Sequence, residues 1–103
     1  MQHILDEIED ILRYGRVPRF WFFMDRMRQR AVVNCLMVIG EATKKLPDAL
    51  RQQHPAIPWR EMARMRDRLI HDYSRIKVYT VWNVVKREIP ELKKQVLIVL
   101  KTL

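Results

Sequence analysis

This sequence of 103 residues has few of the small residues from which phosphate-binding loops and serine nucleophiles are built. Its only glycines are Gly15 and Gly40, which cannot form the glycine-rich loop of a Rossmann or P-loop nucleotide site. Ser74 is the only serine, and no nucleophile-elbow pattern surrounds it. The sequence therefore excludes these two kinds of nucleotide site and gives no support to a serine hydrolase.

Cysteine, histidine and long apolar runs are also scarce. Cys35 is the single cysteine, so no internal disulfide can form, which indicates a reducing cytoplasm. Cys35 lies on an apolar helical stripe and is interpreted as a core residue. The histidines, His3, His54 and His71, show no metal-ligand spacing with it, so we expect no metal and no cofactor. The longest apolar runs are far shorter than a membrane span, and no secretory leader is recognisable, so no membrane partner is expected.

Acidic residues are outnumbered, with 12 Asp and Glu against 20 Lys and Arg and a net charge of +8. The surplus is uneven, because the stretch from Arg13 to Arg30 is rich in arginine and its only acid is Asp25. Two interpretations stay open at this point. The stretch is either a solvated basic face or a surface for a polyanion such as nucleic acid.

Apolar residues recur at helical spacing, and no alternating strand pattern competes. The main helices are predicted over Gln2 to Tyr14, about Asp25 to Lys45, Pro58 to His71 or Tyr73, and Lys77 to the C-terminus, with a short helical turn over 49–53. Pro90 should kink the last helix because proline removes a backbone hydrogen bond. The pattern predicts one all-α domain over residues 1–103, an up-and-down four-helix-type bundle with a kinked C-terminal helix.

Two features indicate close contacts between elements. Gly40 lies inside the second predicted helix, where it costs about 1 kcal/mol relative to alanine, so another helix is expected to approach closely there. Residues Phe20–Met24 form an aromatic block that exceeds what one small bundle can bury. We expect part of the block to pack in the core and part to contact a second subunit. Base stacking on these rings is the alternative.

The stretch from Arg66 to Tyr73 contains the residues that metal-free phosphodiester cleavage requires. Arginine binds phosphate through a planar fork of donors, and histidine transfers protons near neutral pH. On an ideal helix Arg66 lies in the apolar sector, where it needs an ion-pair partner, an interface or an anion. Tyr73 lies about 20° from Arg66 on the helical wheel and His71 about 140° away. Arg66 and His71 meet only if the helix ends or distorts near His71, or across a two-fold axis between subunits.

From about Asp25 to its end, the chain resembles the HepT toxins, HEPN-domain proteins that are partners of minimal nucleotidyltransferases. The matching segments are Ile39-Gly40-Glu41-Ala42, Pro55 to Met62 (an HP-x-IPWRE pattern that begins at His54), the R-x4-H-x-Y motif of Arg66 to Tyr73, and Val81-Trp82 with Ile89-Pro90-Glu91-Leu92. The segments occur in family order and at family spacing. The resemblance implies a dimeric HEPN fold, and a metal-independent endoribonuclease toxin that cleaves cellular RNA, either tRNA or mRNA.

Carried over by position, the resemblance implies that Arg66 and His71 are the catalytic pair at a homodimer interface. Asp67 occupies a supporting polar position where the family often has asparagine, so its role here is open. Tyr73 matches the tyrosine that the antitoxin, a nucleotidyltransferase of the MntA type, modifies with AMP to silence the toxin. The basic residues that we expect to bind RNA are Arg60, Arg64, Arg68, Arg75 and Lys77.

Two other functions stay open. The chain could be a non-catalytic HEPN subunit that binds nucleotide or substrate for a partner nucleotidyltransferase. It could also be a helical RNA-binding module in which charge, and not chemistry, matters.

Overall fold

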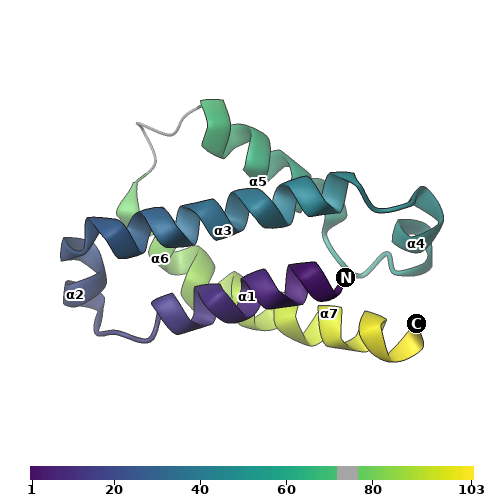
Figure 1. Cartoon of the computed structure of the whole chain (residues 1–103), viewed down its shortest axis with the longest axis horizontal. Coiled ribbons are helices and arrows are strands. Elements are labelled where there is room, and N and C mark those ends of the chain that lie inside the picture. The colour runs from purple at the N-terminus through teal and green to yellow at the C-terminus, as the bar shows by residue number, and fades with distance from the viewer. Residues whose placement is uncertain (72–76) are drawn as a thin grey trace.

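The computed structural model describes residues 1–71 and 77–103, with the side chain of His71 outside the description. Within these ranges every regular element is helical and none is a strand. The elements are α1 (Gln2–Tyr14), α2 (Arg19–Met24), α3 (Arg26–Lys44), α4 (Asp48–Gln53), α5 (Trp59–His71), α6 (Val78–Asn83), the π-helical segment η2 (Val84–Glu88) and α7 (Ile89–Thr102) (Figure 1). The predicted all-α fold is confirmed. None of the helices in the described ranges has both the length and the apolar character that crossing a bilayer requires.

Helix α3 is the element against which α1 and α5 pack. Figure 1 shows α5 along one side of α3, with α1 and α7 along the other. The core on the α1 side is formed by residues such as Ile8, Val32, Leu36 and Val96, all nearly inaccessible to solvent. Each such side chain contributes about 1.5–3 kcal/mol when it is removed from water. Helix α5 adds Trp59, Met62 and Leu69 to the same buried cluster and packs chiefly against α3.

The turn between α1 and α3 is fixed by hydrogen bonds to groups that helix ends leave unsatisfied. The side chain of Asp25 caps α3 by accepting a hydrogen bond from the backbone N–H of Arg28 at 3.0 Å. Gln29 Nε2 donates to the carbonyls of Phe22 at 2.8 Å and Phe23 at 3.1 Å, at the end of α2. Helix α3 therefore begins directly after Asp25, one residue later than the predicted start.

The aromatic block is divided between core and surface. Phe22 is fully buried, and its ring centroid lies 5.2 Å from that of Trp82. Phe20, Trp21 and Met24 are exposed by 69%, 52% and 82%. The prediction that part of the block packs in the core is confirmed. The prediction that a second subunit covers the rest stays a prediction.

The C-terminal helix is distorted directly before Pro90. The backbone N–H of Ile89 donates to the carbonyl of Val84, five residues back, which is the hydrogen bond of a π-helical turn. Pro90 then lies in the first turn of α7, where its missing N–H leaves no gap in the hydrogen bonding. The distortion expected at this proline is present as a widened turn, and helical structure continues on both sides of it.

Candidate active site

Gly40 marks the closest approach of α5 to α3. A Cβ atom built at position 40 would lie 2.2 Å from the Cβ of Arg66 and 2.9 Å from the carbonyl oxygen of Met62. Both distances are shorter than real Cβ contacts, so only glycine fits without movement of a helix. The close helix contact predicted at Gly40 is confirmed, and the residue that crosses it is Arg66.

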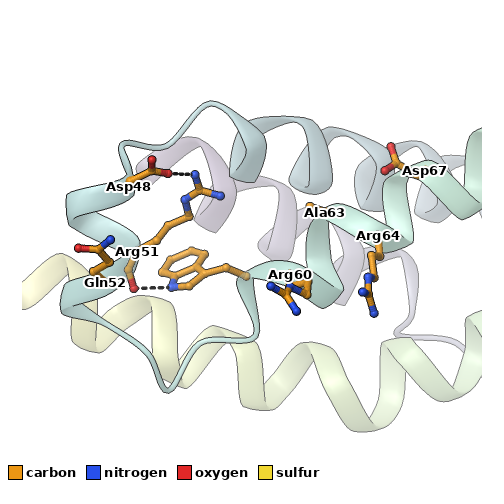
Figure 2. A pocket seen from close by; sticks show the side chains of 8 residues that line it. Asp48, Arg51, Gln52, Arg60, Ala63, Arg64 and Asp67 are labelled. Atoms are coloured by element: carbon orange, nitrogen blue, oxygen red, sulfur yellow. Dashed lines mark hydrogen bonds and ion pairs between the residues drawn. The ribbon is translucent and has the colours of Figure 1, made fainter.

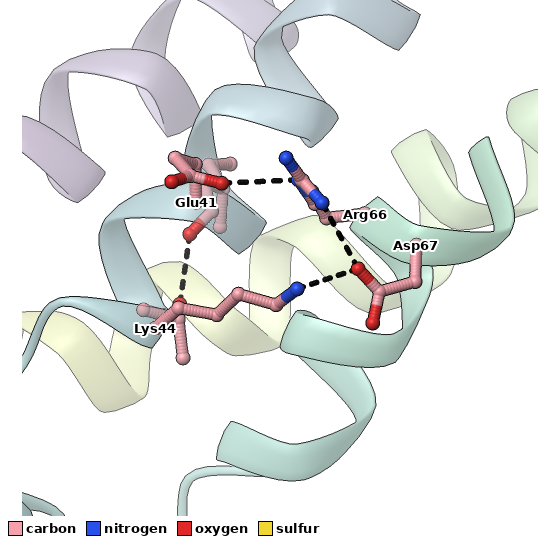
Figure 3. A network of polar contacts seen from close by, with 6 residues as sticks. Glu41, Lys44, Arg66 and Asp67 are labelled. Atoms are coloured by element: carbon pink, nitrogen blue, oxygen red, sulfur yellow. Dashed lines mark hydrogen bonds and ion pairs between the residues drawn. The ribbon is translucent and has the colours of Figure 1, made fainter. Parts of the chain in front are cut away.

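Arg66 is held in a network with two acidic side chains and one further basic side chain (Figure 3). Its Nε lies 3.0 Å from Oε2 of Glu41, and its Nη1 donates to Oδ1 of Asp67 at 3.1 Å. Lys44 Nζ donates to the same Asp67 oxygen at 2.5 Å. Glu41 and Lys44 come from α3, whereas Arg66 and Asp67 come from α5. The arginine on the apolar sector of α5 therefore has the ion-pair partners that its position requires.

The electrostatics of the network keep Asp67 ionised. Hydrogen bonds from Lys44 and then from Arg66 lower the pKa of the Asp67 carboxyl below its ordinary value. The ionised carboxylate orients Arg66 and also offsets part of its positive charge. Glu41 Oε2 is buried and accepts no hydrogen bond within the described part of the chain, so its contact with Arg66 is a charge interaction without hydrogen-bond alignment.

His71 is the last residue of α5. Because positions 66 and 71 both belong to one helix, they lie about 140° apart around its axis and about 7.5 Å apart along it. Helix geometry within one chain therefore does not bring the two predicted catalytic positions onto one face. Tyr73 and Arg75, the other predicted site residues of this stretch, lie outside the described residues.

The predicted RNA-binding residues that the structure describes are solvent-exposed. Arg60, Arg64 and Arg68 follow one another at intervals of four on α5, and Lys77 directly precedes α6. Spacing of four places successive residues within about 40° of each other on a helix. The three arginines therefore form a basic stripe along α5.

A groove of about 440 Å³ lies between α4 and α5 (Figure 2). Its lining residues are Asp48, Arg51 and Gln52 from α4, and Trp59, Arg60, Ala63, Arg64 and Asp67 from α5. Trp59 fixes the groove by donating its indole N–H to the carbonyls of Arg51 at 3.1 Å and His54 at 2.9 Å. The groove thus joins two predicted RNA-binding arginines to Asp67, and through Asp67 to Arg66.

The sequence analysis did not identify Glu41, Lys44 or Arg51 as site residues. Gly40 indicated that another helix crosses α3 near Glu41 and Lys44, but not which residues of that helix would face them. Arg51 had no comparable signal, since its place beside α5 depends on the path of the connection between α4 and α5.

A second group of potential ligands lies away from this site. The ligand atoms of Glu7, Asp10 and Cys35 are all within 4.8 Å of one another. Burial, a hydrogen bond with Glu7 and the charges of Glu7 and Asp10 together raise the pKa of the Cys35 thiol to about 12. A thiol that stays protonated is a poor nucleophile at neutral pH, and Cys35 is buried within the hydrophobic core. Cys35 is therefore a core residue, as predicted.

Comparison with known proteins connects the chain to ribonucleases. The family profile described as "Ribonuclease HepT-like" matches residues 1–99. A Thermococcus cleftensis protein named "Probable ribonuclease HepT" is 46% identical over 94 residues, which cover 90% of this chain and 86% of the relative. A Methanocaldococcus jannaschii protein named as a candidate RNase is 44% identical over 93 residues, covering 89% of this chain and 77% of the relative. No solved structure matches the chain significantly.

Proposed function

Because the chain belongs to the HepT-like ribonuclease family, and is an endoribonuclease by that membership, we propose that Arg66 and His71 are its catalytic pair. The observation that carries this proposal is the position of Arg66. It crosses α3 at Gly40 and is held between Glu41 and Asp67 on the helix that ends at His71. An arginine fixed in this way is pre-organised to bind a phosphate, with little conformational freedom left to lose.

The chemistry follows from these two residue types. The 2′-oxygen of RNA attacks phosphorus, the bond to the 5′-oxygen breaks, and the products carry a 2′,3′-cyclic phosphate and a 5′-hydroxyl. His71 accepts the proton of the 2′-hydroxyl or supplies the proton to the leaving 5′-oxygen. Arg66 stabilises the charge that develops on the non-bridging phosphate oxygens. This division of labour requires no metal ion.

Arg66 retains donors for a phosphate despite its ion pairs. Its Nε and Nη1 face Glu41 and Asp67, while Nη2 donates to no acceptor among the residues that the structure describes. A guanidinium presents five N–H donors in one plane, so the outward edge can bind one or two phosphate oxygens. The proposed role of Glu41 and Asp67 is to aim that edge.

The proposed active enzyme is a homodimer in which α5 of each subunit contributes to both active sites. A two-fold axis near α5 would bring Arg66 of one subunit to His71 of the other, a contact that one continuous helix does not make. The exposed side chains of Phe20, Trp21 and Met24 provide apolar surface suited to a subunit interface.

The proposed cellular role is that of a toxin in the cytoplasm, silenced by a minimal nucleotidyltransferase of the MntA type. The position of Tyr73, two residues after His71, supports this regulation. An AMP group on the Tyr73 hydroxyl would add bulk and negative charge beside the catalytic pair and exclude RNA.

The test is cleavage of a labelled RNA in EDTA by wild type, Arg66→Ala and His71→Ala. We expect wild type to produce ends with cyclic phosphate and both variants to lose cleavage by about a hundredfold or more. A requirement for added divalent metal would contradict the proposed mechanism. Full activity of either variant would remove that residue from the catalytic pair. Cleavage by neither wild type nor variants would favour a non-catalytic RNA-binding role.

A further inference from the structure

The groove between α4 and α5 has the charge of a site for a polyanion. Asp48 forms an ion pair with Arg51, and Asp67 forms ion pairs with Lys44 and Arg66. Both acids of the groove are therefore balanced by their own partners. Arg60 and Arg64 are exposed and form no ion pair within the described part of the chain. The uncompensated positive charge of the groove is thus carried by these two guanidinium groups.

The groove is larger than a compact anion requires. Its volume of about 440 Å³ exceeds the space that a lone phosphate fills and is comparable with sites for small organic ligands. Arg60, Arg64 and Arg68 are spaced by about 6 Å along α5, because four residues rise by that distance in a helix. The stripe of guanidinium groups runs from the groove toward His71 at the end of the same helix.

The groove also has a direct connection to the proposed catalytic arginine. Asp67 lines the groove and accepts a hydrogen bond from Arg66 Nη1 at 3.1 Å. Figure 2 shows Arg60 and Arg64 on α5, with Asp67 further along the same helix. Asp67 therefore links the groove to the proposed catalytic arginine, while Arg64 lies about 20° from the position of His71 on the helical wheel.

We propose that the α4–α5 groove binds a segment of single-stranded RNA that flanks the cleaved bond, with Arg60 and Arg64 as its phosphate ligands. This inference rests on the proposed ribonuclease function and adds the path of its substrate. Arginine planes also stack on unpaired bases, and Gln52 offers an amide for hydrogen bonds to a base edge. The segment bound in the groove is single-stranded, because these contacts require unpaired bases.

The test compares the double variant Arg60→Gln/Arg64→Gln with the charge-matched control Arg87→Gln/Lys101→Gln. Arg87 and Lys101 are exposed residues of the C-terminal helical segment, outside the groove. Two substrates are used: a dinucleotide that spans only the cleaved bond, and a 20-nucleotide single strand. For each protein, the ratio of kcat/KM for the long substrate to kcat/KM for the short substrate is measured. We expect this ratio to be at least about tenfold lower in the groove variant than in wild type. The control should keep the wild-type ratio.

Binding supplies a second measurement that does not depend on cleavage. In fluorescence anisotropy with the labelled 20-nucleotide strand, the salt slope of the groove variant should be smaller by about 1.4, since each phosphate contact on a single strand contributes about 0.7. An unchanged slope together with an unchanged kcat/KM ratio would overturn the groove proposal. If free AMP displaces the labelled strand as effectively as an unlabelled strand does, the groove is a site for a mononucleotide instead. If wild type cleaves neither RNA, the proposed function fails, while the salt slope still tests the groove.

Discussion

Gly40 and Arg66 are in contact across the α3–α5 interface so closely that glycine is required at position 40. The added Cβ would lie 2.2 Å from the Cβ of Arg66, at the base of the side chain that the proposed mechanism uses. We therefore expect stability and activity to be coupled at this contact, because the same separation of helices sets the packing of α5 and the position of the guanidinium.

Gly40→Ala should destabilise the protein although alanine favours helix by about 1 kcal/mol. Overpacking at a backbone and Cβ contact costs about 1–3 kcal/mol, and the helices must separate to relieve it. We expect a lower free energy of unfolding in urea and a lower kcat for RNA cleavage at a temperature where the variant is folded.

The matched control is Gly15→Ala, because a Cβ at position 15 would lie 2.5 Å from a methyl group of Val85, far from Arg66 in the sequence and outside its network. This variant should lose stability and keep its kcat. Equal kcat values for the two folded variants would show that the Gly40 contact does not position Arg66.

Glu41→Gln should lower kcat by about 10- to 100-fold with a smaller change in KM. The variant keeps the shape of the side chain and removes the charge that faces Arg66 Nε at 3.0 Å, so the guanidinium is less firmly oriented. Glu91→Gln, an exposed position in α7, is the control and should behave as wild type.

A double-mutant cycle separates positioning from a general effect of the Glu41 substitution. If Glu41 acts through Arg66, adding Glu41→Gln to Arg66→Ala should cause no further loss of activity. Losses that multiply in the double variant would mean that Glu41 contributes by another route.

The pH dependence of stability should contain a contribution from Cys35 on the alkaline side. The pKa of its thiol is about 12 in the folded protein against an ordinary value of 9.0, so folding favours the neutral form. The resulting stability is fully present below pH 9 and is lost as pH rises toward 12. At pH 10 the loss from this group is on the order of 1 kcal/mol.

Cys35→Ala should remove this contribution, although it also costs some packing at every pH. The measurement is the difference in free energy of unfolding between wild type and variant, which should narrow by roughly 1 kcal/mol between pH 8 and pH 10. A difference that is constant with pH would contradict the assigned pKa. In native wild type the thiol should also react slowly with a disulfide reagent at pH 8, and rapidly after unfolding.

Local signals in the sequence predicted most of the fold and part of the site. The stripe of Ile4, Ile8 and Ile11 followed by Gly15 predicted both ends of α1, and Gly40 predicted a close helix contact. These features are set by residues within one helix, where spacing alone decides which side is buried. The R-x4-H-x-Y spacing selected Arg66 as a candidate catalytic residue, and that role stays a prediction.

The partners of Arg66 could not be predicted, because they depend on how two helices cross. Glu41 and Lys44 face Arg66 and Asp67 only in the register that the Gly40 contact imposes on α3 and α5. The form of the helix distortion at Pro90 could not be predicted either. A missing backbone hydrogen bond predicts a distortion, but packing of the flanking turns decides whether the helix bends or widens into a π-helical turn.

Tyr73→Phe should separate regulation from catalysis. The phenol has an ordinary pKa near 10, which is poorly matched to base catalysis at neutral pH, so the variant should keep at least part of its ribonuclease activity. With an active MntA-type nucleotidyltransferase and ATP, wild type should gain AMP in intact-mass spectrometry and lose activity. The variant should do neither. Modification of both proteins would assign the acceptor to another residue, and modification of neither would indicate inhibition by occlusion.

Mixing two inactive variants should restore activity if the site is shared between subunits. In a dimer of Arg66→Ala with His71→Ala, one of the two sites combines the intact Arg66 of one subunit with the intact His71 of the other. Random exchange makes half of the dimers mixed, so the mixture should recover about a quarter of wild-type activity. If both residues of a site came from one chain, no dimer in the mixture would contain an intact pair, and activity would stay at the level of the single variants. Light scattering before and after mixing shows whether the proteins are dimers when activity is measured. A monomer that is fully active at micromolar concentration would exclude a shared site, because a single subunit would then contain the complete active site.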